Sequence, residues 1–355
     1  MDIKKLTKIK RLRIPENRDL IFGLRLNRNE RVQDWENNIY IKIFSKLKKY
    51  QLGSYPDNSK IYKKISEFFD IDEEKLLVTS GIDGAIKTIW EVLTEPGTLV
   101  GLICPSYAMY EVYSNIYDTN LEIIQYDSKS LRLDRKKLFK FLKRKPKILF
   151  LPNPNQPIED NLTLKEISSL CEYAKKNGTY IVIDEAYYHF GIKSSLPLVK
   201  KHKNLIILRT FSKGFGVPSI RLGFLVSDSK NIEFLSKTRL AYESNLFTDE
   251  VAIYLMENFR KVEKYINKVI EGREYTKKKL IELGLNVNGR KGNYLLVGLE
   301  SKETASKLYN YLLKNKIYVK GNYKSPLENY ILITCGPKNI MNILIKRIKI
   351  FLSKK

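Results

Sequence analysis

The sequence predicts an α/β fold, in which a large domain with a mostly parallel seven-stranded sheet is followed by a smaller α+β domain. In the first two thirds of the chain, short apolar runs bounded by turn residues alternate with helical patterns, as in βα units. After residue 230 the alternation stops, and a long helical stretch precedes only two further apolar runs. A chain of 355 residues is also too long for one simple core, which favours two domains.

The expected elements follow from apolar runs of strand length and from helical periodicity between them. Strands are expected at 75–80, 99–104, 121–126, 147–152, 180–184, 205–210 and 222–227. Helices are expected at 83–93 and 162–178, the second with Gly178 as its stop signal. The C-terminal part is expected to contain a helical stretch at 248–283, a strand at 293–299, a helix at 303–315, a strand at 330–335 and a final helix.

The composition is globular, with 43% hydrophobic and 29% charged residues. The formal net charge is +25, from 64 basic and 39 acidic residues, and a balance of this size can indicate nucleic-acid binding. The basic residues are spread along the chain, however, and form no stripe interleaved with aromatic residues. No apolar run reaches the roughly 18 residues of a membrane helix. We therefore expect lysines on solvated helix faces, and neither nucleic acid nor membrane as a partner.

Cysteine and histidine usage excludes several kinds of site. Cys104, Cys171 and Cys335 show no metal-ligand spacing and fit a reducing compartment. With His189 and His202 as the only histidines, a histidine metal site or a Ser-His-Asp triad is close to excluded, and no metal is expected. The N-terminus is basic but lacks an apolar core and a small-residue cleavage site, so we expect no secretory signal and a cytoplasmic location.

Polar and aromatic residues gather where the expected strands end. Ligands of parallel α/β sheets bind at this edge. Each residue alone suits an ordinary turn, a helix cap or a surface lysine, whereas five such strand ends together indicate a site for one small, flat, phosphorylated ligand. In strand order the residues are Gly81, Asp83 and Gly84; Pro105, Ser106 and Tyr107; Asn153, Asn155 and Gln156; Asp184 and Tyr187; and Ser212 and Lys213.

As a set, these motifs resemble those of the fold-type I pyridoxal 5′-phosphate (PLP) enzymes. Within this class the chain is most similar to the histidinol-phosphate aminotransferase branch, which also contains phosphothreonine decarboxylase-like proteins. The resemblance covers about residues 20 to 350. It is carried by "RLNRNE" (25–30), "SYPD" (54–57), "TSGIDGAI" (79–86), "CPSYAMY" (104–110), "NPNQP" (153–157), "DEAY" (184–187) and "TFSKGFGVPSIRLG" (210–223).

The resemblance implies that PLP is the cofactor and that Lys213 is the catalytic residue, which forms a Schiff base with the cofactor aldehyde and later moves protons. It also implies that Asp184 pairs with the pyridine nitrogen, that Tyr187 bonds the phenolic oxygen and that Tyr107 stacks on the ring. The residues expected to hold the cofactor phosphate are Ser212, Arg221 and the helix start at Gly81, Ile82 and Asp83.

The resemblance further implies a homodimer with shared active sites. Tyr55 matches the position that reaches the partner's cofactor, and Asn29 and Glu30 match a segment that covers the substrate. The implied organisation is an N-terminal arm at 1–45 that packs on the small domain and the partner, a large PLP-binding domain at 46–240 and a small C-terminal domain at 241–355.

Three departures from the family concern cofactor and substrate contacts. The family segment Asn-Pro-Thr-Gly here reads "NQPIED", so Gln156, with Asn155 beside it, replaces the asparagine that contacts the cofactor. Leu332 stands where relatives place the arginine that pairs with the substrate carboxylate, and a buried unpaired carboxylate would cost on the order of several kcal/mol. Lys320 replaces the arginine that binds the substrate phosphate, so a cation remains there.

The resulting hypothesis is a PLP-dependent aminotransferase that acts on a small, phosphorylated amine or amino acid and not simply on histidinol phosphate. The alternative is a PLP-dependent decarboxylase of a phosphorylated amino acid of the phosphothreonine or phosphoserine type, since both reactions use the same frame of residues. A basic nucleic-acid-binding protein is a remote alternative. Which of Gln156 and Asn155 contacts the cofactor stays open at this point.

Overall fold

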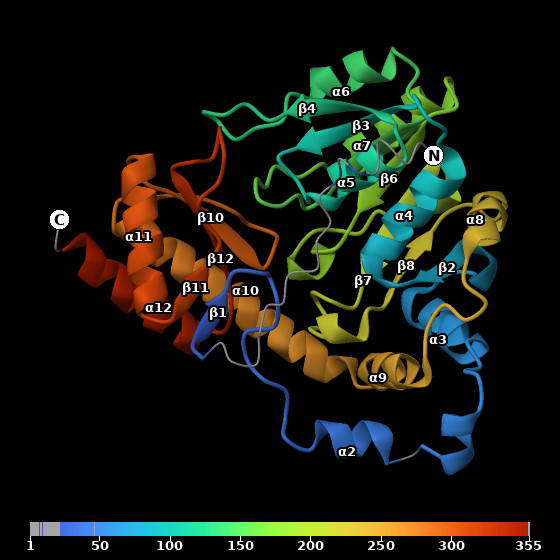
Figure 1. Cartoon of the computed structure of the whole chain (residues 1–355), viewed down its shortest axis with the longest axis horizontal. Coiled ribbons are helices and arrows are strands. Elements are labelled where there is room, and N and C mark those ends of the chain that lie inside the picture. The colour runs from blue at the N-terminus through green and yellow to red at the C-terminus, as the bar shows by residue number, and fades with distance from the viewer. Residues whose placement is uncertain (1–6, 8, 10–21, 46, 354–355) are drawn as a thin grey trace.

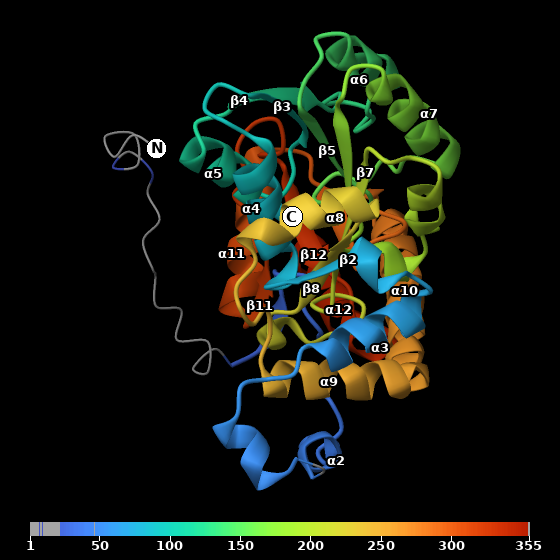
Figure 2. The same ribbon diagram turned by 90° about the vertical axis from the view of Figure 1, so that its right-hand side faces the viewer.

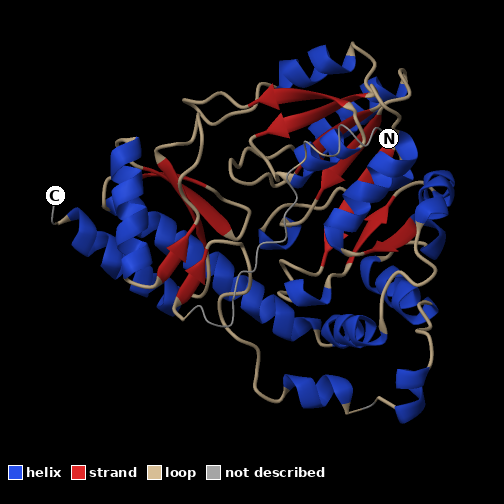
Figure 3. Cartoon of the chain, in the orientation of Figure 1, coloured by secondary structure: helices blue, strands red, loops and turns tan. Residues whose placement is uncertain are grey.

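The computed structural model describes residues 7, 9, 22–45 and 47–353, and its largest element is a seven-stranded sheet in the order β2-β8-β7-β6-β5-β3-β4 (Figures 1 and 3). Neighbouring strands are parallel from β7 to β4, whereas β8 is antiparallel to both β2 and β7. The mostly parallel seven-stranded sheet predicted from the sequence is thus confirmed. The strands are β2 (Leu76–Thr79), β3 (Leu99–Cys104), β4 (Asn120–Gln125), β5 (Ile148–Pro152), β6 (Tyr180–Asp184), β7 (Leu205–Thr210) and β8 (Gly223–Val226).

The central strands read as continuous apolar runs because both faces of the sheet are covered by helices. In β5, Phe150 stacks on Trp90 at a ring-centroid distance of 4.5 Å, whereas Leu149 and Leu151 belong to the core of the opposite face. The Trp90 face is covered by α4 (Gly81–Leu93), α5 (Met109–Ile116) and α8 (Ser229–Leu235), and the other face by α3 (Ser59–Phe69), α6 (Arg135–Leu142) and α7 (Leu164–Lys175).

The C-terminal part forms a second, smaller group of strands backed by helices, seen at the left of Figure 1. Its antiparallel sheet has the order β12-β10-β9, and a separate β11 pairs in parallel with β1, a strand from near the N-terminus. Residues 27–30, which follow β1, are therefore carried by the C-terminal part. The elements are β1 (Leu24–Leu26), β9 (Asn286–Asn288), β10 (Tyr294–Gly298), β11 (Ile317–Val319), β12 (Tyr330–Thr334), α10 (Phe259–Glu282), α11 (Lys302–Lys314) and α12 (Lys338–Leu352).

The helical stretch expected at 248–283 is two helices, α9 (Leu246–Glu257) and α10, which meet at Asn258. Asn258 has φ −108° and ψ 34°, and both its backbone N–H and its side-chain amide donate to the Tyr254 carbonyl. An asparagine side chain can compete in this way with the helical hydrogen bonds, and the apolar pattern continues through the break, so periodicity alone does not mark it. α9 packs against α3 and α2 (Ile39–Phe44), and two views place α2 at the lower edge of the molecule (Figures 1 and 2).

Candidate active site

A cavity of about 830 Å³ opens where β5, β6 and β7 end and α4 begins. Its opposite wall consists of residues 27–30 and 319–321, so the large sheet and the C-terminal part both contribute. This is the edge at which parallel α/β sheets bind ligands. The cavity is lined by most of the site residues predicted from the sequence, namely Asn29, Ile82, Asp83, Tyr107, Gln156, Asp184, Tyr187, Ser212, Lys213, Arg221 and Lys320.

Lys213 follows β7 and crosses the cavity to the opposite wall. Its Nζ donates to the carbonyls of Arg28 at 3.0 Å and Asn29 at 3.1 Å, and lies 5.8 Å from the ring centroid of Tyr187. The pKa of Lys213 is lowered to about 8, mainly by burial and also by the nearby charge of Arg221, while Glu30 and Asp184 oppose the fall. A lysine with this pKa is partly neutral near pH 8, the state that a nucleophile or a base requires.

Asp184 is the last residue of β6 and is 6% exposed. Its Oδ2 accepts a hydrogen bond from the hydroxyl of Tyr110 at 2.8 Å, and its Oδ1 accepts one from the N–H of Ala186 at 2.9 Å. Burial raises the pKa of this carboxyl to about 6, although both hydrogen bonds oppose the rise. Tyr110 was not predicted from the sequence. Its role has no local signal in the sequence, because the contact forms only when α5 packs against the end of β6.

The start of α4 is suited to an anion. Ser80, the residue before the helix, makes no side-chain cap hydrogen bond, so the first backbone N–H groups are not capped by it. Gly81 has φ +69°, and a Cβ there would lie 2.9 Å from Nη2 of Arg221, so glycine is required for the guanidinium to approach. Asp83 accepts a hydrogen bond from the Tyr107 hydroxyl at 3.0 Å and lies 3.7 Å from Arg221.

Asn29 joins the two walls of the cavity. Its side-chain amide donates to the Tyr187 hydroxyl at 2.9 Å, and its Oδ1 accepts from the Thr334 hydroxyl at 3.1 Å. Its backbone N–H also donates to Thr334 Oγ1 at 2.8 Å. Asn29 is 3% exposed, and its φ of 54° is one that asparagine tolerates better than most residues. These bonds orient the Tyr187 hydroxyl from the C-terminal part of the chain.

In the loop after β5, Gln156 lines the cavity, whereas Asn155 does not. The amide of Asn155 instead donates to the carbonyls of Pro105 at 3.0 Å and Ile158 at 2.9 Å, and the residue is 2% exposed. Asn155 therefore holds the loop against the end of β3, and Gln156 is the amide available to a ligand.

Besides Asn155, three of the predicted site residues do not line this cavity. Gly81 lies behind Arg221, as described above. Tyr55 is 79% exposed and stacks on Tyr242, with ring centroids 4.6 Å apart. Leu332 is 1% exposed in β12, two residues from Thr334 and therefore on the same face of the strand.

The residues of the cavity fit PLP as a set. A buried carboxylate, a lysine amine and an uncapped helix start with a nearby arginine lie around one space, as a ring nitrogen, an aldehyde and a phosphate require. The Tyr187 hydroxyl and the Gln156 amide add polar groups at the same wall. Within the described part of the chain no group of acidic, cysteine or histidine side chains could hold a metal ion, and no helix is long and apolar enough to cross a membrane.

Replacing Asp184 by asparagine should remove a pH-dependent loss of stability from the protein purified without PLP. Because burial raises the pKa of Asp184 from 3.8 to about 6, the native state binds this proton more tightly than the unfolded state. The free energy of unfolding therefore falls as pH rises from about 4 to 6 and stays lower above pH 6, by up to about 3 kcal/mol. Urea unfolding between pH 4 and pH 8 should show Asp184→Asn to be more stable than the native chain above pH 6 and similar near pH 4. A difference that does not change with pH would contradict this account of Asp184.

Comparison with known proteins agrees with this geometry. The family model of aminotransferase class I and II matches residues 25–348. A histidinol-phosphate aminotransferase from Clostridium novyi (strain NT) is 27% identical over 321 residues, which cover 89% of this chain and 88% of the relative.

Among solved structures, histidinol-phosphate aminotransferase from Sinorhizobium meliloti, crystallised with pyridoxal-5′-phosphate, superposes with a TM-score of 0.88 over 99% of this chain and 98% of that one, at 18% identity. L-threonine-O-3-phosphate decarboxylase from Porphyromonas gingivalis superposes with a TM-score of 0.76 over 93% and 99% of the two chains, at 20% identity. These two likenesses show the fold. The family match together with the curated relatives shows the activity: the chain belongs to the aminotransferase class I and II family and is a PLP-dependent aminotransferase of fold type I.

Proposed function

We propose that this aminotransferase transfers the amino group of a small phosphorylated amine or amino acid, with Lys213 as its catalytic residue. The observation that carries the substrate proposal is the pair of cations on the C-terminal wall. Arg28 and Lys320 both line the cavity, on the side opposite Asp184 and the start of α4. Partial removal from solvent and the charge of Arg28 lower the pKa of Lys320. A substrate phosphate near both cations would relieve this repulsion.

The proposed roles follow from the positions of the side chains. PLP, when bound, supplies the electron sink that makes loss of the substrate Cα proton feasible. Lys213, with its pKa lowered to about 8, would take that proton from the substrate Cα and deliver it to cofactor carbon C4′. Asp184 would pair with the ring nitrogen and favour its protonated form, and Tyr187, whose hydroxyl is oriented by Asn29, would donate to the phenolic oxygen.

The cofactor phosphate is assigned to the start of α4. Ser212 lines the cavity on the strand side, and Arg221 lies against Gly81. Arg221 is close enough to Asp83 to interact with it but does not form a tight ion pair, so its guanidinium can turn to a phosphate. Tyr107, hydrogen-bonded to Asp83, is proposed to stack on the ring, and Gln156 is proposed to contact the cofactor in place of the asparagine of relatives.

The substrate end of the cavity differs from that of a chain with arginine at position 332. Lys320 and Leu332 are directly opposite each other and exchange backbone hydrogen bonds of 3.0 and 2.7 Å. Side chains of directly opposite residues project from the same face of an antiparallel pair, so Leu332 lies beside the lysine that lines the cavity. A leucine there offers an α-carboxylate no partner, which argues against free aspartate or glutamate as preferred substrates.

We also propose a homodimer with shared active sites. Large apolar and aromatic side chains are exposed in two stretches that are far apart in the sequence but meet where Tyr55 stacks on Tyr242, and a patch of this kind is uncommon on a monomer. They are Tyr40, Ile41, Tyr50, Leu52 and Tyr55 in residues 40–55, and Leu240, Tyr242 and Phe247 in residues 240–247. In such a dimer Tyr55, which does not line its own cavity, serves the cofactor of the partner, and residues 22–45 of the N-terminal arm contact both the small domain and the partner. Most of residues 1–21 of the expected arm at 1–45 lie outside the described residues.

The substrate proposal is tested by a half-reaction screen of amines, each with and without a phosphate group, against the PLP-loaded enzyme. Phosphorylated amines should react with a kcat/KM about tenfold or more higher than their unphosphorylated forms, which corresponds to about 1.4 kcal/mol of differential binding. In Lys320→Met this preference should largely disappear, and Lys213→Ala should show no turnover with any amine. Equal rates with and without phosphate would refute the substrate class. Release of carbon dioxide without a keto acceptor would support the decarboxylase alternative.

Replacing Leu332 by arginine should shift the amine preference toward ordinary α-amino acids. An Arg–carboxylate pair provides both energy and orientation, so we expect the kcat/KM for glutamate to rise by about tenfold or more. Leu332→Met, which keeps the side chain neutral and similar in volume, is the matched control and should leave the preference unchanged. If arginine and methionine give the same preference, position 332 does not reach the substrate.

Mixing an impaired variant with an inactive one tests whether the two subunits share an active site. Tyr55→Ala should impair activity although Tyr55 lies outside its own cavity, and Lys213→Ala should abolish it. A hybrid dimer has one active site with an intact Lys213 from one chain and an intact Tyr55 from the other. Subunit exchange between the two variants should therefore restore activity, and sedimentation should show twice the chain mass. An active monomer, or a mixture that stays inactive while Tyr55→Ala alone is impaired, would count against the proposal.

A further inference from the structure

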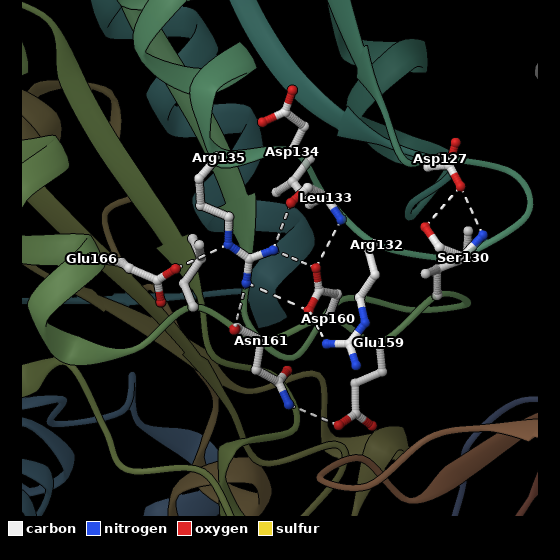
Figure 4. A network of polar contacts seen from close by, with 12 residues as sticks. Asp127, Ser130, Arg132, Leu133, Asp134, Arg135, Glu159, Asp160, Asn161 and Glu166 are labelled. Atoms are coloured by element: carbon white, nitrogen blue, oxygen red, sulfur yellow. Dashed lines mark hydrogen bonds and ion pairs between the residues drawn. The ribbon is translucent and has the colours of Figure 1, made fainter.

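Glu159 and Asp160 are neighbours in the loop after β5, are 8% and 9% exposed, and point in different directions (Figure 4). Asp160 binds residues that precede or begin α6: it forms ion pairs with Arg132 and Arg135 and accepts a hydrogen bond from the Leu133 N–H at 2.7 Å. All of these partners belong to the large-sheet part of the molecule. Asp160 therefore anchors the loop to its own side.

Glu159 binds the C-terminal part of the molecule. Its Oε2 accepts three backbone hydrogen bonds from the turn between β9 and β10, from Arg290 and Lys291 at 2.9 Å and from Gly292 at 3.1 Å. Its backbone N–H donates to Asn288 Oδ1 at 2.9 Å. Successive N–H groups that converge in this way form a concave binding site for an anion, and here the anion is a side chain of the same protein.

The loop that carries Glu159 and the turn that it binds are both close in sequence to residues of the cavity wall or to their direct partners. On one side, Gln156 lies three residues before Glu159 and lines the cavity. On the other side, Asn293 follows the turn, and its side-chain amide donates to the Asn29 carbonyl at 3.2 Å. The same carbonyl accepts the hydrogen bond from Lys213 Nζ at 3.1 Å. The turn held by Glu159 is thus adjacent in sequence to Asn293, a direct partner of the wall opposite Lys213.

We propose that Glu159 is a positioning residue, whose carboxylate fixes the loop carrying Gln156 in register with the segment that carries Asn29 opposite Lys213. In the family segment Asn-Pro-Thr-Gly, a glycine stands at the position of Glu159, so a chain with that segment lacks this side-chain contact. The contact belongs to the same departure that replaces the family asparagine by Gln156. The structural part of the proposal is independent of the substrate, and only its kinetic part rests on the proposed role of Lys213.

The chemistry of the contact explains why a carboxylate is suited to it. Three N–H donors meet one oxygen, and a charged acceptor forms stronger hydrogen bonds than a neutral one. Asn161 donates to the second oxygen of Glu159 at 2.8 Å. In Glu159→Gln, the amide oxygen can still accept from the turn while Asn161 turns its own amide to accept from the new NH₂ group. In Glu159→Ala, the three N–H groups lose their acceptor.

Hydrogen exchange of the protein purified without PLP tests the structural part. In Glu159→Ala, the amides of residues 290–292 should exchange about tenfold or more faster than in the native chain, with Glu159→Gln between the two. Asp160→Asn is the matched control, because it removes one negative charge from the adjacent buried position. It should speed exchange at Leu133 and leave residues 290–292 protected. Unchanged exchange at 290–292 in Glu159→Ala, or an equal increase in Asp160→Asn, would overturn the proposal.

The kinetics of the PLP-loaded enzyme test the positioning part. Because the substrate's anion contacts lie elsewhere in the cavity, Glu159→Ala should lower kcat about tenfold with little change in KM, and Glu159→Gln should recover most of the loss. A native kcat in Glu159→Ala despite faster exchange at 290–292 would show that the contact is structural only, and would overturn the positioning role. If no amine reacts with the native enzyme, the proposed function fails, while the exchange result still decides whether Glu159 holds the turn.

Discussion

The site depends on one interaction, the hydrogen bonds from the Lys213 ammonium to the carbonyls of Arg28 and Asn29. They join the end of β7, in the large sheet, to a segment that is carried by β1 and β11 in the C-terminal part. A cofactor that engaged Lys213 would remove the lysine as a donor to these two carbonyls. The segment is nevertheless still held, because Asn29 also binds Thr334 and accepts from Asn293. The lysine can therefore leave and return without release of the wall opposite it.

Two opposite pKa shifts in the cavity have the same cause. Burial raises the pKa of Asp184 to about 6 and lowers that of Lys213 to about 8, so each charged form is disfavoured in the protein alone. Paired shifts of this kind are typical of catalytic sites. A protonated ring nitrogen would favour the ionised form of Asp184, and a neutral amine is the form of Lys213 that reacts with an aldehyde. Binding of the cofactor would thus offset the cost of burying these two groups.

The local sequence was sufficient to predict the large sheet and the polar residues at the ends of its strands. Six of the seven strands are apolar runs buried on both faces, a pattern that few other structures produce, and only the edge strand β4 is largely half-buried or exposed. The parallel order then brings Asp184, Lys213 and the start of α4 to one edge, although they are far apart in the chain. Family resemblance added roles for these residues that periodicity could not supply.

What the sequence did not reveal depends on long-range pairing. The strand β1 has three residues, and only its pairing with β11, nearly 300 residues later, brings Asn29 to the cavity. In the sequence, Glu159 looks like any acidic residue of a loop, because its partners are the backbone N–H groups of the distant turn at 290–292. Tyr110 is an aromatic residue on an amphipathic helix, and its bond to Asp184 follows from packing between α5 and the sheet. Such residues carry no local signal, because their partners are selected by the tertiary structure.

The pairing of Lys320 with Leu332 explains how one change in sequence can redirect the substrate. Residues in a hydrogen-bonded antiparallel pair have Cα atoms about 5.5 Å apart, so the cation kept at 320 lies one strand spacing from position 332, where the cation is lost. Lysine presents a point charge and not the planar fork of arginine, so it fixes the position of an anion but less of its orientation. A phosphate, which has several equivalent oxygens, is less affected by this than a carboxylate that must be held in one plane. The same two residues therefore weaken the recognition of an α-carboxylate and keep that of a phosphate.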